Sequence, residues 1–408
     1  MWAEFSFFGL QAMLVYYMTK QLHFPQAKSS LIYGAYGAAA FFSPFFGGLI
    51  ADKWLGRTPS VVIGAAMMML GHFAMAFEPL LFPALALVAL GNGLFLPPLA
   101  IQVGGLYADD DPRKAYAYSA YYMGINLGGL LAPLICGTLG ELYGWHWGFA
   151  AAGFGMAIGL VVYCSFLRFL PSEPTRAQLV GDTSTAQDPV VRRDVATLLL
   201  MVSMVVLFRI GYEQSGNVIA LWVSDFTDRS LDLFGHRVTI PATWFQSINP
   251  LLIILGTPVL IRVWRRTKKY ETTAHLLRRM AIGCAIAGAA MLVMVCAALA
   301  SGPNGLRVSS LWVFAYFVLL TLGELFVIPV GLTLIESLAP VRFASMAMGG
   351  WYIAKFIGSL LAGVMGAYWR VLPPALYFSV GMALTLAAAA SLLVVARSRN
   401  DVRSPERS

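Results

Sequence analysis

Long apolar runs recur along the whole chain, and they constrain its fold more than any other feature. A helix that crosses a bilayer needs about 20 predominantly apolar residues, because lipid offers no partners to backbone polar groups. Runs of this kind, bounded by charged residues, Gly or Pro, predict spanning helices at 5–22, 29–50, 59–78, 80–106, 116–140, 145–170, 195–222, 242–263, 275–300, 310–337, 342–368 and 372–396. Of the 408 residues, 59% are hydrophobic and 12% are charged, so twelve spans leave no room for a separate catalytic domain. The sequence therefore predicts an all-α integral membrane protein that is not an enzyme.

The Lys and Arg residues are divided unevenly between the two sides of this predicted topology. With the N-terminus inside, 20 of the 28 basic residues fall on the inner side and 6 on the outer side. Inner loops of membrane proteins are enriched in Lys and Arg. We therefore expect a multi-pass protein of a bacterial-type inner (plasma) membrane with both termini in the cytoplasm. The net charge of +8 then reflects topology, and we expect no nucleic-acid partner.

A polar stretch rich in Pro, Gly, Ser and Asp divides the spans into six and six. We predict an N-terminal six-helix bundle at 1–170, a cytoplasmic linker at 171–194, a C-terminal six-helix bundle at 195–396 and a cytoplasmic tail at 397–408. One Gly-to-Pro spacing recurs in both halves. Gly91 precedes Pro97 in span four, and Gly323 precedes Pro329 in span ten, by the same number of residues. Interrupted helices at matching places suit a transporter's central site, although Gly and Pro are also frequent in membrane helices generally.

Five charged residues fall inside or near the middle of predicted spans: Glu4, Arg209, Glu213, Glu324 and Lys355. A charge in hydrocarbon costs at least about 2.5 kcal/mol, so such residues are candidates for function. Arg209 and Glu213 lie four residues apart, which places them on one helix face, either as a functional pair or as a neutral pair that permits insertion. Glu324 has no opposite charge nearby on its own helix, and burial favours the protonated form of a carboxyl group. We interpret it as a proton carrier.

Residues 47–57 (GGLIADKWLGR), between spans two and three, resemble the G-x-x-x-D-R/K-x-x-G-R loop of the major facilitator superfamily. Asp52, Gly56 and Arg57 occupy the motif positions, and the resemblance implies that they form a conformational loop. It also implies the superfamily fold, with 12 transmembrane helices in two six-helix bundles.

Longer segments resemble one branch of that superfamily, the proton-dependent oligopeptide transporters. Residues 121–130 (YYMGINLGGL), 212–216 (YEQSG), 244–250 (WFQSINP) and 323–332 (GELFVIPVGL) are similar to its F-Y-x-x-I-N-x-G-S-L, F-E-Q-x-G, W-F-Q-S-x-N-P and G-E-x-x-x-S-P-x-G-L signatures. The resemblance implies proton-dependent transport, and the predicted proton-coupling residues are the charges Glu324, Glu213, Arg209 and Glu4. The predicted substrate-binding residues are Asn126, Tyr122, Glu324, Gln214, Asn249, Trp351, Lys355 and Gln11.

The chain departs from the family where the family carries cations. In the stretch 1–11 (MWAEFSFFGLQ), matched to E-x-x-E-R-F-x-Y-Y-G-x-R, Glu4 and Gln11 take the places of the two Arg residues. In 91–100 (GNGLFLPPLA), Leu96 takes the place of a Lys. Lys355 either replaces a lost cation at the substrate cavity or forms a fixed pair with Glu324. The 171–194 linker is also too short for the two extra helices that bacterial members usually carry.

We therefore expect a secondary active transporter that takes up peptides or peptide-like compounds with protons by alternating access. The alternative is an exporter or uniporter of the same fold for a non-peptide solute, with a rewired charge network. We expect no cofactor and no metal, with a proton gradient as the energy source. The expected partners are a small-molecule substrate, protons and membrane lipid, and we expect a monomer.

Overall fold

The computed structural model describes residues 1–107, 111, 113–170, 192–233, 236–265, 272–338 and 344–400. The chain forms two compact units, one made of Met1–Phe24 and Ala35–Thr185 and the other of Pro25–Gly34 and Ala186–Ser408. Most of the predicted linker and the end of the predicted tail, residues 171–191 and 401–408, lie outside the described residues. The domain boundaries given above remain predictions.

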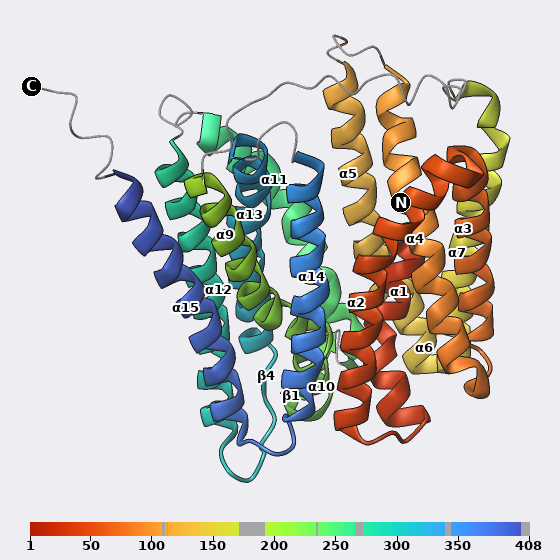
Figure 1. Cartoon of the computed structure of the whole chain (residues 1–408). Helices are drawn as coiled ribbons and strands as arrows, with labels where there is room; N and C mark the ends of the chain where they lie inside the picture. The colour runs from red at the N-terminus through yellow and green to blue at the C-terminus, as the bar shows by residue number, and fades with distance from the viewer. Residues whose placement is uncertain are drawn as a thin grey trace, which may run out of the picture. The chain divides into compact units, whose positions relative to one another are not determined.

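The first half of the chain is helical almost throughout (Figure 1). Its elements are α1 (Trp2–Tyr16), η1 (Tyr17–Gln21), α2 (Gln26–Ile50), η2 (Ala51–Leu55), α3 (Arg57–Ala74), η3 (Glu78–Leu80), α4 (Leu81–Gly105), α5 (Arg113–Ala132), η4 (Pro133–Gly137), α6 (Thr138–Tyr143), α7 (Trp145–Ser165) and η5 (Leu167–Phe169). The η1, η2 and η4 turns are π-helical and η3 and η5 are 3-10 helices. The first turns of α2 belong with the second unit, where the Ser30 hydroxyl donates a hydrogen bond to Asn217 Oδ1 at 2.8 Å.

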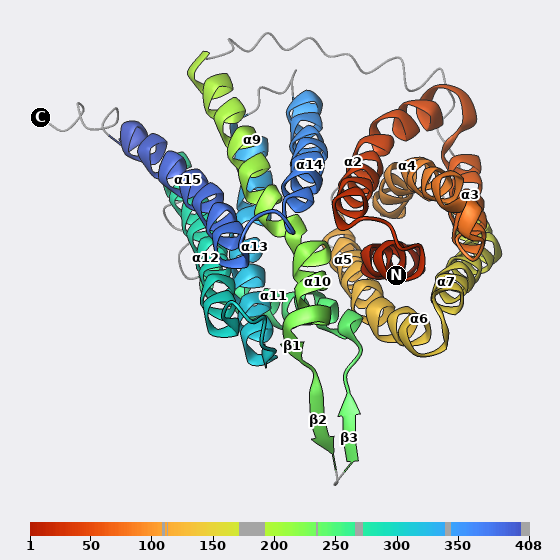
Figure 2. The same cartoon turned by 90° about the horizontal axis from the view of Figure 1, so that it is seen from below.

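The second half adds two very small sheets to its helices. Its elements are α9 (Arg192–Tyr212), η6 (Glu213–Gly216), α10 (Val218–Phe226), β1 (Thr227–Asp228), β2 (Ser230–Leu233), β3 (His236–Thr239), η7 (Ala242–Ser247), α11 (Ile248–Arg265), α12 (Thr273–Ser301), β4 (Val308–Ser309), α13 (Leu311–Leu338), α14 (Ala344–Ala367) and α15 (Pro374–Asn400). Strands β1 and β4 pair in parallel, and β2 and β3 form the antiparallel hairpin seen in Figure 2. The sequence reading did not predict these strands.

All twelve predicted runs coincide with helical segments, so that prediction is confirmed. Among the described residues, ten helical stretches are long and apolar enough to cross a membrane. The remaining two predicted runs are also mostly helical: α1 with η1 matches the first, and α3 covers the third as far as Ala74, but neither is counted among these ten. Helices satisfy their own backbone hydrogen bonds, which explains why the apolar runs take this form.

Large apolar side chains remain exposed on many helices, among them Phe154, Val161, Leu255, Val259 and Val394. These residues are suited to contact with lipid, whereas the interior of each unit is filled by other apolar and aromatic side chains.

The glycines of the repeated Gly-to-Pro spacing, Gly91 and Gly323, lie at close contacts between helices in both units. A Cβ atom added at Gly91 of α4 would lie 2.6 Å from the carbonyl oxygen of Gly64 on α3. In the second unit, a Cβ atom added at Gly323 of α13 would lie 2.7 Å from the carbonyl oxygen of Gly283 on α12. Both glycines therefore allow the backbones of two helices to touch, as small residues do at helix contacts in membranes. Each unit uses the same device at the equivalent span.

Candidate functional site

The second unit buries a cluster of charged side chains. Arg209 near the end of α9 and Glu213 at the start of η6 form an ion pair through Arg209 Nη2 and Glu213 Oε1, and both residues are 5% exposed. The four-residue spacing predicts this pairing, because side chains four apart share a helix face. The Ser359 hydroxyl of α14 donates a second hydrogen bond to Glu213 Oε1 at 3.4 Å. A buried ion pair is stabilised when further hydrogen bonds satisfy its remaining polar atoms.

Glu324, halfway along α13, is the second buried acid of this cluster and is 8% exposed. Asn249 Nδ2 on α11 donates to Glu324 Oε2 at 2.8 Å and to Thr321 Oγ1 at 3.0 Å. The Tyr212 hydroxyl forms a further side-chain hydrogen bond with Glu324. The predicted residues Glu324 and Asn249 are thus direct partners. The carboxylate is held by donors from two neighbouring helices.

Two cations act electrostatically on Glu324 from helices α9 and α14, namely Arg209 and Lys355. The Lys355 ammonium also lies 5.6 Å from the centre of the Tyr352 ring, and the Arg209 guanidinium lies 4.9 Å from that of Tyr212. Figure 1 and Figure 2 both show α9, α13 and α14 beside one another in the second unit. Four predicted residues therefore meet as two acids and two bases, with a formal net charge of zero when all are ionised.

Two other predicted substrate residues are enclosed within the second unit. Gln214 is fully buried, and its Nε2 donates to the carbonyl oxygens of Ile210 at 3.0 Å and Ala362 at 3.1 Å. The Tyr377 hydroxyl donates to Gln214 Oε1 at 2.8 Å. Trp351 is 3% exposed and packs on Gly331, where an added Cβ would lie 2.5 Å from its ring. The contacts described for Gln214 and Trp351 are with other residues of the second unit. Their contact with substrate stays a prediction.

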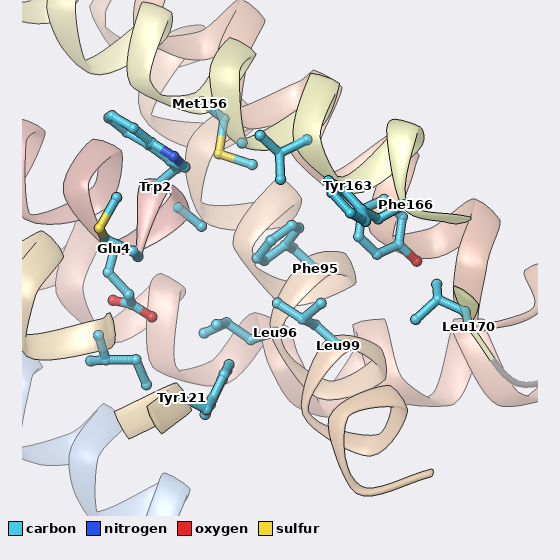
Figure 3. Close-up of a pocket in the computed structure, with 15 residues that line it drawn as sticks. Trp2, Glu4, Phe95, Leu96, Leu99, Tyr121, Met156, Tyr163, Phe166 and Leu170 are labelled. Atoms are coloured by element: carbon cyan, nitrogen blue, oxygen red, sulfur yellow. The ribbon is translucent and has the colours of Figure 1, made fainter. Parts of the chain in front are cut away.

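The first unit holds a cavity of about 310 Å³ between α1, α4, α5 and α7 (Figure 3). Its wall is largely apolar and aromatic, with Trp2, Phe95, Leu96, Tyr121, Met156 and Phe166 among the lining residues. In Figure 3, Glu4 and Trp2 lie toward one end of the cavity and Phe166 and Leu170 toward the other. Among its described lining residues, Glu4 is the one charged side chain, beside the α-amino group of Met1. The volume lies at the lower end of the range for small-molecule pockets.

Three predicted substrate residues of the first unit do not line this cavity. Asn126 is 7% exposed, and its Nδ2 donates to the carbonyl oxygen of Tyr122 at 3.0 Å along α5. Tyr122 is exposed, and Gln11 of α1 is half-buried. The structure therefore brings Glu4 and Leu96 to one cavity and places Asn126, Tyr122 and Gln11 elsewhere on α5 and α1.

Comparisons with known proteins agree with this architecture. The family model for the Major Facilitator Superfamily matches residues 2–362. "Peptide transporter YePEPT" of Yersinia enterocolitica is 32% identical, over 97% of this chain and 92% of its own length. The "Di-/tripeptide transporter" of Lactococcus lactis subsp. cremoris is 31% identical, over 86% of this chain and 84% of its own. The chain belongs to the proton-dependent oligopeptide transporter family of the major facilitator superfamily.

Solved structures of this transporter family share the fold along nearly the whole chain. A peptide transporter POT in complex with sulfate superposes with a TM-score of 0.86 at 27% identity, covering 97% of this chain and 92% of the other. A POT family transporter in complex with 5-aminolevulinic acid gives a TM-score of 0.87 at 25% identity, covering 97% and 94%. The predicted all-α major facilitator fold is confirmed by these likenesses.

The loop motif of the transporter is a π-helical turn, η2, followed by Gly56. This glycine has φ +82°, donates its backbone N–H to Ala51 O at 2.8 Å and accepts a hydrogen bond from the Ser60 hydroxyl at 2.7 Å. A side chain at this positive φ would be strained, which explains why the motif needs glycine here. Asp52 is exposed and Arg57 begins α3.

Sequence reasoning did not select Tyr212 and Ser359, which complete the charged cluster. Ser359 follows Lys355 by four residues on α14, so helical periodicity places both on one face. Tyr212 directly precedes Glu213 in the 212–216 segment. Both signals were present in the sequence, but neither residue is charged and so neither stood out within an apolar span.

Proposed function

We propose that this transporter takes up peptides or peptide-like compounds together with protons, by alternating access between its two helical bundles. Its relatives named as peptide transporters support the substrate class. The family resemblance supports the energy source, a proton gradient. The uneven distribution of Lys and Arg supports a bacterial-type inner membrane location with both termini in the cytoplasm. A monomer is sufficient for this mechanism, because each unit buries its own site residues.

The observation that carries the proposal is the environment of Glu324. A carboxyl group that is 8% exposed in a membrane helix is costly unless it has partners or binds a proton. Its partners here are neutral donors, Asn249 and Tyr212, and two cations, Lys355 and the Arg209 that also pairs with Glu213. Asn249 and Tyr212 can rotate to serve either a carboxylate or a carboxylic acid, since an amide and a hydroxyl each offer a donor and an acceptor. Glu324 can therefore load and release a proton without losing all of its hydrogen bonds.

The test is proton-driven uptake into proteoliposomes. The full chain is reconstituted and uptake of a dipeptide is followed with and without an inward proton gradient. We expect accumulation with the gradient, and we expect Glu324→Gln to abolish accumulation while exchange of substrate across the membrane survives. Asp225→Asn is the matched control, because Asp225 is a partly exposed acid of the same unit, paired with Arg370 at 3.1 Å. Full accumulation by a well-folded Glu324→Gln protein would reject the proposal.

The alternative function is export or uniport of a non-peptide solute. The apolar cavity in the first unit favours it, because its described lining offers no Lys or Arg side chain to a carboxylate. The same vesicles decide between the two, since a uniporter only equilibrates its solute and does not concentrate it when an inward proton gradient is imposed.

A further inference from the structure

The β2–β3 hairpin of the second unit has two chemically different faces. Leu231 of β2 lies opposite Val238 of β3. The next pair, Asp232 and Arg237, points to the other side, because side chains alternate along a strand. His236, nearer the tip, shares the side of Leu231 and Val238. The hairpin is therefore mainly apolar on one face and charged on the other.

The apolar face of the hairpin is exposed. Leu231 is 43% exposed and Val238 is 46% exposed, and all four residues of β3 are exposed. An isolated two-stranded hairpin is marginally stable in water and becomes stable when it packs against another element or surface. The described residues of the unit leave this face uncovered, so a surface from outside the chain is needed to cover it.

The base and the polar face of the hairpin already have partners within the chain. Arg229 Nη1 donates to the carbonyl oxygen of Ile240 at 2.7 Å, and the backbone N–H of Ile240 donates to Arg229 O at 2.9 Å. Arg237 Nη2 donates to the Ser230 hydroxyl at 3.1 Å. The Ser230 hydroxyl donates in turn to Asp228 Oδ1 at 2.6 Å. These hydrogen bonds hold the two strands together, and they contribute nothing to covering the apolar face.

The hairpin begins and ends beside two stretches that are long and apolar enough to cross a membrane. The stretch Ala196–Phe226 ends four residues before Ser230. The stretch Ala242–Trp264 begins three residues after Thr239. At about 3.3 Å per residue, the base of the hairpin lies within about 10–13 Å of both span ends. Trp244, at the start of the second stretch, is 40% exposed, and Trp is enriched at membrane–water interfaces. The base therefore lies at the level of the lipid headgroups.

The direction of the hairpin keeps it at that level. Figure 2 shows the hairpin reaching away from the helices of its own unit. Figure 2 is turned by 90° from Figure 1, in which the helices run up and down, so the hairpin runs across the helix axes. A segment that crosses the direction of spanning helices, beside their ends, lies along the membrane surface. One of its faces then turns to lipid and the other to water.

We propose that the β2–β3 hairpin lies flat on the phospholipid bilayer, with Leu231 and Val238 at the boundary between headgroups and acyl chains. Asp232 and Arg237 then face water on the opposite side. The occupant of the exposed apolar face is the bilayer itself, and its contact continues the lipid-facing surface of the helices. This inference concerns anchoring of the second unit and does not depend on which solute the transporter carries.

Charge and area favour a lipid surface over a protein partner. The hairpin and its base carry two acids, Asp228 and Asp232, and two bases, Arg229 and Arg237, so no strong net charge selects an acidic or a basic partner. A stable contact with a second copy of the chain needs about 20–30 residues a side, far more than two apolar side chains provide. Burial at a bilayer surface needs no such area, because the spanning helices already hold the protein in the membrane.

The first experiment maps the two faces with nitroxide spin labels on the full chain in phosphatidylethanolamine–phosphatidylglycerol liposomes. The four native cysteines are replaced by Ala, and single cysteines are introduced as Leu231→Cys and Val238→Cys or, on the polar face, as Asp232→Cys and Thr239→Cys. Val394→Cys on α15, at a position 65% exposed, gives the reference for lipid contact. Oxygen concentrates in lipid and a nickel chelate in water. The ratio of their collision rates should approach the lipid reference on the apolar face and be at least about threefold lower on the polar face.

The second experiment measures hydrogen exchange of the hairpin amides in the same liposomes. Leu231→Ser combined with Val238→Ser should speed exchange at least about tenfold, because the hairpin loses the apolar contact that keeps it closed. Asp232→Ser combined with Thr239→Ser is the matched control on the opposite face, and it should change exchange by less than about threefold. Added salt should leave the exchange of the parent protein unchanged, since the attachment is apolar.

Three results would overturn the inference. One is an equal oxygen-to-nickel ratio for the labels on the two faces. Another is spin–spin broadening of the Leu231→Cys or Val238→Cys label that grows with the protein-to-lipid ratio, which identifies a second copy of the chain as the cover. The third is exchange that responds equally to the two double variants. If one of the apolar-face cysteine variants does not fold, the other one decides. Because no substrate or proton gradient is used, failure of the transport proposal would leave these results unchanged.

Discussion

Removing one partner of the buried Arg209–Glu213 pair should destabilise the second unit strongly. Both residues are 5% exposed, so Arg209→Leu leaves a buried carboxylate and Glu213→Gln leaves a buried guanidinium. A broken buried pair costs about 3–5 kcal/mol. For a unit of roughly 200 residues, 1 kcal/mol corresponds to about 2–4 °C, so each single variant should melt roughly 6–20 °C lower. The double variant buries no uncompensated charge and should lose far less than the sum of the two.

The assay is thermal unfolding of the purified proteins in one detergent at one scan rate, because membrane proteins often unfold irreversibly. Arg370→Leu is the matched control, since Arg370 pairs with Asp225 at 3.1 Å with its side chain 62% exposed. An exposed pair contributes at most about 1 kcal/mol, so this variant should melt within a few degrees of the parent. Additive losses in the double variant, or equal losses for Arg209→Leu and Arg370→Leu, would refute the pairing argument.

Other predictions concern close contacts and single hydrogen bonds. Gly323→Ala should cost about 1–3 kcal/mol in thermal unfolding, because its Cβ would overlap a backbone carbonyl, whereas Gly349→Ala meets nothing within 4 Å and should be neutral. Tyr377→Phe should cost about 1 kcal/mol by removing one hydrogen bond to a buried amide, and a larger loss would show that the hydroxyl has further partners. Gly56→Ala should cost about 1–3 kcal/mol from strain at φ +82°, and unchanged stability would show that the loop relaxes.

Much of the fold follows from local sequence patterns. Apolar runs of sufficient length predict helices because lipid leaves the backbone no other partner. The Arg209–Glu213 pair also follows from local spacing, since four residues make one helical turn. The partners of Glu324 depend instead on how α9, α11 and α14 pack around α13, and residues as distant as Asn249 carry no local signal of that packing. The same holds for Gln214, whose amide is satisfied by Ala362 and Tyr377 from later helices.

The placement of the four central charges within one unit has a consequence for coupling. Because Arg209, Glu213, Glu324 and Lys355 all belong to the second unit, their mutual neutralisation does not depend on the position of the first unit. A cluster whose charges balance carries no net charge through which it could favour one arrangement of the two units. Only an event that changes the balance, such as protonation of Glu324 or arrival of a charged substrate group, gives the cluster a net charge. In the proposed mechanism, such an event would be the step at which proton binding, substrate binding and conformational change become linked.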